Sequence, residues 1–146
     1  MVAYLAFLLY LSCSLRGNGD MYRIESNFKV KYEKCLVDLR YVKPTLLRAF
    51  VDVVEYCKLH EYPLQVTRVV GEKIKNISVS TSHEEGRAID ISVKGMTEKQ
   101  INNMVEYFNV KFYNIGAISY SKGVSTFMYY HVGTAKHIHI QIRPNI

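Results

Sequence analysis

Residues 82 to 92 read SHEEGRAIDIS, a polar turn followed by a segment in which polar and apolar side chains alternate. Alternation with a period of two is typical of a half-buried strand. Asp90 and Ser92 then face one side of a sheet, and Ile89 and Ile91 face the other. We expect His83 to lie in a loop that leads into this strand.

Residues 137 to 143, HIHIQIR, show the same alternation near the C-terminus. One predicted face carries the polar side chains of His137, His139, Gln141 and Arg143, and the other carries three isoleucines. Each of the two strands therefore has an apolar face for a core and a polar face with groups that can bind a metal.

Pairing of the two strands in one sheet could bring His83, Asp90 and His139 onto one zinc ion. Two imidazoles and one carboxylate would leave the fourth tetrahedral position to water. That arrangement is typical of a catalytic zinc site rather than a structural one.

The composition limits the organisation and the partners of the chain. At 146 residues and 49% hydrophobic content it can bury one sizeable core, and no linker-like stretch indicates a second. A net charge of +6 favours polyanionic partners. Nucleic acid is not expected, because the basic residues are scattered and no recognition motif is present.

The chain has three cysteines, Cys13, Cys35 and Cys57. Because they are odd in number and widely spaced, they predict neither a disulfide framework nor a cysteine zinc site.

Residues 1 to 20 are expected to form an apolar N-terminal extension, with the domain spanning 21 to 146. The run MVAYLAFLLYLS resembles the hydrophobic part of an export signal, but no positive charge precedes it and about 12 residues are too few to span a bilayer comfortably. The alternative is a hydrophobic segment buried against the domain or against an assembly partner.

Local signals predict two helices. Pro44 occupies a favoured first helical position, and apolar residues at three- and four-residue spacing extend the helix to near His60. Thr97 and Gln100 form a capping-box pattern that opens a second helix, whose core stripe comprises Ile101, Met104, Val105 and Phe108.

Further strands are expected at residues 64 to 70, with Val66 and Arg68 on one side, at Tyr113 to Ser121, and at Ser125 to His131 as the hairpin mate. The predicted class is α+β, with a small antiparallel sheet flanked by helices.

The pattern S-H-x-x-G-x-A-x-D at residues 82 to 90, followed by H-x-H at 137 to 139, resembles the zinc D-alanyl-D-alanine peptidases, the phage L-alanyl-D-glutamate endolysins and the related hedgehog signalling domain. Thr67-Arg68 and Gly116-x-x-x-Tyr120 add to the resemblance, which covers roughly residues 44 to 143. It implies the fold of that family, with His83, Asp90 and His139 as zinc ligands.

The resemblance also implies roles for Arg68 and Tyr120. Arg68 would bind a substrate carboxylate or steady the developing oxyanion, since arginine is a fixed and bidentate donor. The alternative for Arg68 is a solvated arginine on a strand. Tyr120 would contribute to substrate binding.

The sequence departs from the family where many members carry a carboxylate as general base, three residues before the last zinc histidine. Lys136 occupies that position and would normally be protonated. His137 is the best replacement base, because neutral imidazole has a suitable pKa. The alternatives are an exposed His137 or one that supports a ligand. His131 is a weaker candidate, Glu84 and Glu85 are expected to be surface carboxylates, and Gln141 could orient a neighbour.

The resemblance implies a zinc metallopeptidase that hydrolyses peptidoglycan stem peptides, as a D-Ala-D-Ala carboxypeptidase or an L-Ala-D-Glu endopeptidase. The resemblance favours an extracytoplasmic, secreted or virion-associated protein, with the apolar N-terminal segment available to other virion proteins. The first alternative is a non-catalytic zinc-binding structural or cell-wall-binding protein of a phage particle. The second is a fold that binds no metal.

Overall fold

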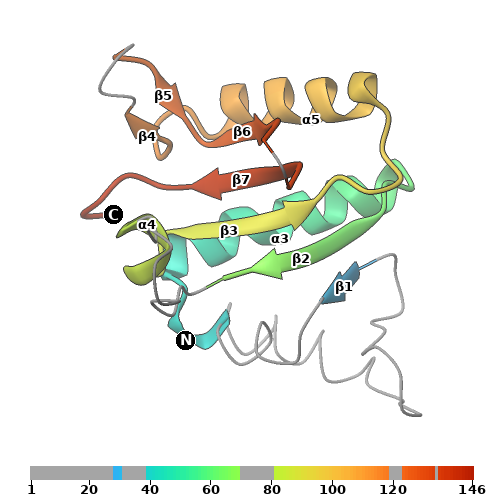
Figure 1. Ribbon diagram of the computed structural model, residues 1–146. Helices are drawn as coiled ribbons and strands as arrows, with labels where there is room; N and C mark the ends of the chain where they lie inside the picture. The colour runs from blue at the N-terminus through green and yellow to red at the C-terminus, as the bar shows by residue number, and fades with distance from the viewer. Residues whose placement is uncertain (1–27, 31–38, 70–80, 119–122, 134) are drawn as a thin grey trace.

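The computed structural model describes residues 28–30, 39–69, 81–118, 123–133 and 135–146 (Figure 1). The expected N-terminal extension and Tyr120 lie outside these ranges. The main sheet contains five strands, β1 (Phe28–Val30), β2 (Leu64–Arg68), β3 (Ala88–Ser92), β7 (His137–Gln141) and β6 (Met128–His131), in that spatial order.

Four of these strands, β2, β3, β7 and β6, form an antiparallel sheet, as predicted. The edge strand β1 was not predicted as part of it, and β1 runs parallel to β2. The chain is therefore an α+β protein, and the two sequence stretches that define its polar face pair directly as β3 and β7.

Both long helices begin where the local signals predict. Helix α3 (Pro44–Leu59) has its proline in the first turn and ends with His60 as the C-cap residue. Helix α5 (Glu98–Lys111) has a complete capping box, in which the Thr97 side chain accepts from the Gln100 backbone and the Gln100 side chain accepts from the Thr97 backbone. Two short elements, the 3₁₀ helix η1 (Leu39–Tyr41) and α4 (Thr81–Glu84), lie near the end of β3 that carries Ala88 (Figure 1).

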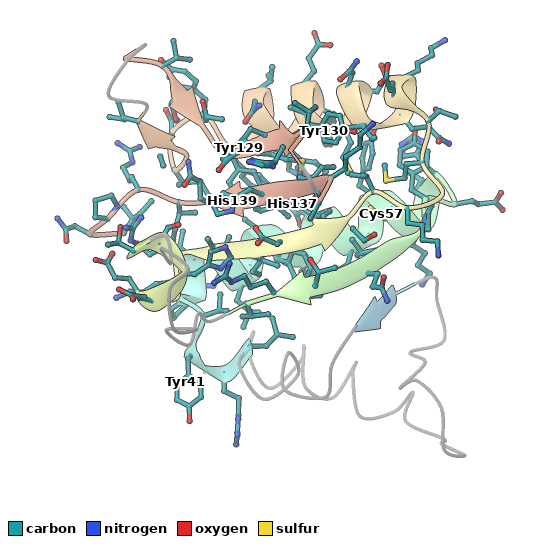
Figure 2. All side chains as sticks on the ribbon, in the orientation of Figure 1. Tyr41, Cys57, Tyr129, Tyr130, His137 and His139 are labelled. Carbon is teal, nitrogen blue, oxygen red and sulfur yellow. The ribbon has the colours of Figure 1, made fainter. Side chains whose placement is uncertain are left out.

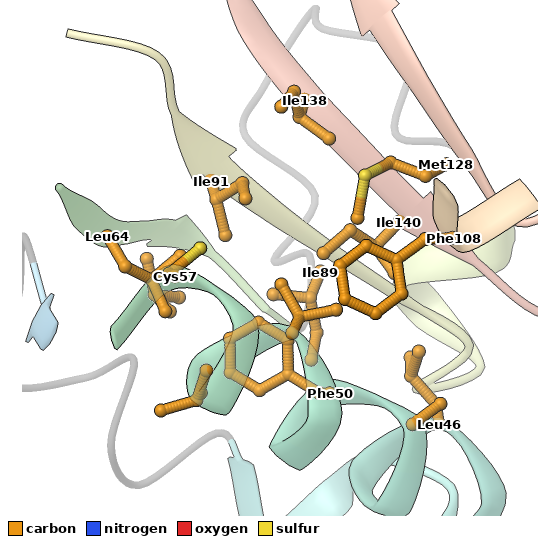
Figure 3. Packing of buried hydrophobic residues seen from close by; sticks show 14 of the residues in the cluster. Leu46, Phe50, Cys57, Leu64, Ile89, Ile91, Phe108, Met128, Ile138 and Ile140 are labelled. Carbon is orange, nitrogen blue, oxygen red and sulfur yellow. The ribbon is translucent and has the colours of Figure 1, made fainter. Parts of the chain in front are cut away.

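The core lies on one face of the sheet. Phe50 of α3 and Phe108 of α5 are fully buried in one cluster with Ile89 of β3 and Ile140 of β7 (Figure 3). Both helices therefore cover the same face, instead of flanking the sheet on two sides. The opposite face carries the alternating polar side chains.

The strand predicted at Tyr113 to Ser121 is wrong over its first part. The backbone of α5 caps at Phe112, and the amides of Ile115 and Gly116 both bond to the Phe112 carbonyl, which makes this segment a turn. Within the described part of this segment, Ala117–Ile118 (β4) forms a strand, and β4 pairs with β5 (Ser125–Thr126). The rest of the predicted hairpin mate, β6, instead joins the main sheet beside β7.

The prediction that Val66 and Arg68 share one side is also wrong. Val66 pairs with Ile91, whereas Arg68 pairs with Asp90, because the register shifts between them. Such a bulge places one extra residue in β2 and redirects the side chains that follow it. Val66 is fully buried in the core, and Arg68 lies opposite Asp90 on the polar face.

Candidate metal centre

His83 is positioned by a single helical turn rather than by the expected loop. It belongs to α4, which closes with a bond from the Glu85 amide to the Thr81 carbonyl and continues into Gly86. Gly86 has a φ of +67°, a left-handed conformation that glycine adopts without strain. This turn brings the buried His83 to the edge of the polar face beside β3.

Asp90 and His139 are placed by the register of β3 and β7. They are directly paired, so their side chains leave the sheet on the same face. His137 pairs with Ser92 one step further along and shares this face. The alternation seen in the sequence therefore places Asp90 and His139 on one face, and α4 adds His83 to complete the predicted group of three ligand candidates.

The three side chains meet around the Asp90 carboxylate. One carboxylate oxygen, Oδ2, lies 3.2 Å from His83 Nε2, and the other, Oδ1, lies 2.7 Å from His139 Nδ1. One potential ligand atom from each residue lies within 4.8 Å of the others. All three residues are buried, with exposed fractions of 2% for His83, 7% for Asp90 and 4% for His139.

Hydrogen bonds behind both imidazoles select the nitrogen that faces Asp90. His83 Nδ1 donates to the Val69 carbonyl at 2.6 Å, which leaves Nε2 for the centre. His139 Nε2 lies 3.3 Å from Gln141 Oε1, and donation to this oxygen leaves Nδ1 for the centre. Partners of this kind orient histidine ligands and fix their tautomers in metal sites. The orienting role predicted for Gln141 is consistent with this contact.

The donor set fits a tetrahedral divalent cation. Zinc bonds of about 2.0–2.1 Å imply ligand atoms about 3.3 Å apart. The 3.2 Å contact between His83 and Asp90 matches this spacing, whereas the 2.7 Å contact between His139 and Asp90 is a direct hydrogen bond that would lengthen around an ion. A cation at this point would replace the protons that these contacts otherwise require. His83, Asp90 and His139 could therefore hold a metal ion.

The electrostatics of Asp90 favour a charged carboxylate. Burial by itself would raise the pKa of Asp90, but hydrogen bonds from His139 and His83, together with the charges of these rings, lower the pKa well below its usual range. A carboxylate that stays ionised is the form that a metal needs.

His137 lies beside the three ligand candidates and is more accessible. Its Nε2 is 3.9 Å from Asp90 Oδ1, and 24% of its side chain is exposed. Its Nδ1 lies 2.7 Å from the Ala135 carbonyl, so this nitrogen carries the proton and Nε2 has a free lone pair on the side of the centre.

Two of the remaining candidates lie on the polar face of the sheet, and the other three are exposed surface residues. Arg68 is half-buried opposite Asp90, and His131 pairs with His137 in register, with the two rings stacked 4.8 Å apart. Lys136 is exposed immediately before β7. Glu84 is exposed, and Glu85 is an exposed partner of Arg87 at 2.5 Å, in line with the expected surface role.

Sequence reasoning missed Tyr129. This residue of β6 pairs with His139, and the centroids of the two rings are 4.9 Å apart (Figure 2 shows both side chains). Burial, and the charge of Asp90, raise the pKa of Tyr129. Tyr129 lies two residues before His131, so the sequence indicates that the two side chains share one strand face. Only the pairing of β6 with β7 shows that this face borders the centre.

Comparison with known proteins provides no assignment. The chain matches no protein-family model, no curated protein and no solved structure at a significant level. Within the described ranges, no helix has the length and apolar character needed to cross a bilayer. The geometry of the site is therefore the main basis for a function.

Proposed function

We propose that this protein is a zinc metallopeptidase that cleaves peptidoglycan stem peptides, with a fold of the zinc D-alanyl-D-alanine peptidase type. One observation carries the proposal. Buried His83, Asp90 and His139 converge from α4, β3 and β7, and the accessible imidazole of His137 lies beside them. Among the described residues the group offers three ligands, and three ligands leave a position for water or substrate, whereas structural zinc sites usually have four protein ligands.

Zinc suits the site better than magnesium or calcium, because two of the three ligands are imidazoles and the harder cations prefer oxygen. When bound, zinc would polarise a peptide carbonyl and lower the pKa of water toward neutrality. His83 and His139 would hold it through Nε2 and Nδ1, the nitrogens that their outer hydrogen bonds leave available.

His137 is the proposed general base. The lone pair on its Nε2 faces the centre, because Nδ1 is engaged by the Ala135 carbonyl. Nε2 can accept a proton from the attacking water and return it to the leaving amine. A positioned base of this kind contributes typically about 10²–10⁴-fold to a rate.

Arg68 is proposed to stabilise negative charge on the substrate. The bulge in β2 puts Arg68 opposite Asp90, on the face that carries the ligand candidates. A guanidinium stays charged at all relevant pH values and offers paired donors to a carboxylate or an oxyanion. The free carboxylate of a stem peptide, or its scissile carbonyl, presents such a group.

Peptidoglycan as substrate rests on the resemblance described above, and the charge of the chain is compatible with it. A net charge of +6 attracts an anionic cell wall. The same resemblance favours a location outside the cytoplasm, as a secreted or virion-associated hydrolase. The choice between D-Ala-D-Ala and L-Ala-D-Glu cleavage is an outcome of the experiment below.

Mass spectrometry of muropeptides tests the proposal. The zinc-loaded protein is incubated with purified peptidoglycan, beside His137→Ala and a control, His60→Ala, whose site is the C-cap of α3. We expect new amine termini at one type of stem-peptide bond with the wild type and the control. With His137→Ala we expect the yield to fall by about 10²–10⁴-fold while one zinc ion remains bound.

The second candidate function is a non-catalytic zinc-binding structural or wall-binding protein of a phage particle. Lys136, at the position where related peptidases carry a carboxylate, favours it. A wild type that binds one zinc ion per chain and releases no amine termini would establish this candidate. If elemental analysis finds no more zinc in the wild type than in His139→Ala, zinc has no part in either candidate function.

A further inference from the structure

Tyr129 is placed by the sheet at the metal centre, on the side away from Arg68. The spatial order β2-β3-β7-β6 puts Arg68 on the first of these strands and Tyr129 on the last. Arg68 is opposite Asp90 and Tyr129 is opposite His139, so each borders one ligand candidate on the polar face. A group bound between Asp90 and His139 would thus have a potential donor on each flank.

The side chain of Tyr129 offers this centre more than an apolar surface. Its ring lies against the His139 ring at a tilt of 41°, and 38% of the residue is exposed. A phenol is protonated at neutral pH and can donate one hydrogen bond. Within the described part of the chain, the Tyr129 hydroxyl has no hydrogen-bond partner. Its donor is therefore available to a ligand.

The neighbouring tyrosine provides a contrast. Tyr130 pairs with Ile138 and packs partly buried against the core, because successive side chains of β6 point to opposite faces. In Figure 2 the labelled Tyr129, His139 and His137 side chains lie close to one another on β6 and β7. Packing alone would be served by phenylalanine at position 129, but only tyrosine adds a donor.

We infer that the Tyr129 hydroxyl donates a hydrogen bond to the oxyanion that forms on the scissile carbonyl, opposite Arg68. This inference rests on the proposed peptidase function, because it assigns a residue to the same site. A preorganised donor that gains strength as charge develops stabilises the transition state more than the substrate. The hydroxyl keeps its proton throughout.

The test compares Tyr129→Phe with Tyr130→Phe, since each variant removes one hydroxyl and keeps the ring. Removal of one oxyanion donor lowers kcat by about 10²-fold or more. For Tyr129→Phe we expect a loss of this size with little change in KM or in the dissociation constant for zinc. For Tyr130→Phe we expect kinetics like those of the wild type.

A binding measurement gives an answer that does not depend on turnover. Inorganic phosphate, a tetrahedral oxyanion, is titrated calorimetrically into the zinc-loaded forms of the same proteins. We expect phosphate affinity to fall by about tenfold in Tyr129→Phe, as for loss of a hydrogen bond to a charged group, and to be unchanged in Tyr130→Phe.

Equal phosphate affinity in the wild type and Tyr129→Phe would overturn the inference, as would weaker zinc binding by Tyr129→Phe, which would indicate a structural role. The two proposals fail separately. A wild type that releases no amine termini refutes the peptidase function, whereas an active wild type with an equally active Tyr129→Phe variant refutes only the role of Tyr129.

Discussion

Gln141 is positioned to select which nitrogen of His139 would face a metal. Its Oε1 lies 3.3 Å from His139 Nε2, on the far side of the ring from Asp90. We predict that Gln141→Leu, which keeps the approximate volume and removes the acceptor, weakens zinc binding by about 10- to 100-fold, as for other partners that orient histidine ligands. Competition with a chromogenic chelator measures the dissociation constant.

The matched control for Gln141 is Gln141→Glu, which retains an acceptor at the same position. We expect its zinc affinity to stay near that of the wild type. If Gln141→Leu bound zinc as tightly as the wild type, the 3.3 Å contact would have no part in orienting His139.

Individual residues of the site differ in how far the sequence could predict them. Asp90 and His139 could be predicted, because strict alternation assigns each to the polar face whatever the rest of the fold does. Arg68 reached this face only through a bulge, which reversed the side expected from simple alternation. Tyr129 depended on the choice of partner for β6, and no local pattern in the sequence encodes that choice.

At the scale of elements, the link between η1 and α4 fixes the position of His83. Gly86 follows α4, and its carbonyl accepts from the Lys43 amide at 2.8 Å. A Cβ added to Gly86 would lie 2.2 Å from the Tyr41 carbonyl oxygen. The backbones of these two elements therefore approach too closely for any residue but glycine.

We predict that Gly86→Ala lowers the free energy of unfolding by roughly 3 to 5 kcal/mol, the range of severe single substitutions. Gly123→Ala is the control, because Gly123 has a similar φ of +62° and no atom lies within 4 Å of its added Cβ. It should cost only the left-handed penalty of about 1–2 kcal/mol. Urea denaturation measures both, and equal losses would show that the contact with Tyr41 is unimportant.

The two long helices were predictable because their signals are local. Pro44 and the Thr97–Gln100 capping box fix the helix starts within a few residues of sequence. The start of β6 was not predictable in this way, because a side chain far away in the sequence helps to set it. Asn109 of α5 accepts from the amides of Phe127 and Met128 and donates to the Met128 carbonyl, each at 2.8 Å. These bonds tie the segment to α5 and separate β6 from β5.

For the molecule as a whole, one face of the sheet packs against the hydrophobic core and the opposite face carries the ligand candidates. Ile89 and Ile140 anchor the face that both helices cover, while Asp90 and His139, their neighbours in sequence, face the other way. The α+β class followed from this alternation together with the local signals for the two helices. The parallel edge strand β1 and the location of both helices on one face did not, because they depend on contacts between segments far apart in sequence.

A metal at the centre would link folding to binding across the whole chain. The ligand candidates come from positions 83, 90 and 139 and converge only when α4, β3 and β7 are in place, so an unfolded chain offers no comparable site. A ligand that binds only the folded state adds about 4 kcal/mol when its free concentration is about 1,000 times its dissociation constant. For a chain of this size that corresponds to a rise in Tm of about 8–16 °C.

We therefore predict that a chelator lowers the Tm of the zinc-loaded protein by about this amount, and that added zinc restores it, as measured by differential scanning calorimetry. His139→Ala should show one Tm with or without zinc, because two remaining ligands bind the ion weakly. His131→Ala should keep the full shift, since His131 stacks on His137 and lies outside the ligand set. An equal shift in His139→Ala and the wild type would place the stabilising ion elsewhere on the chain.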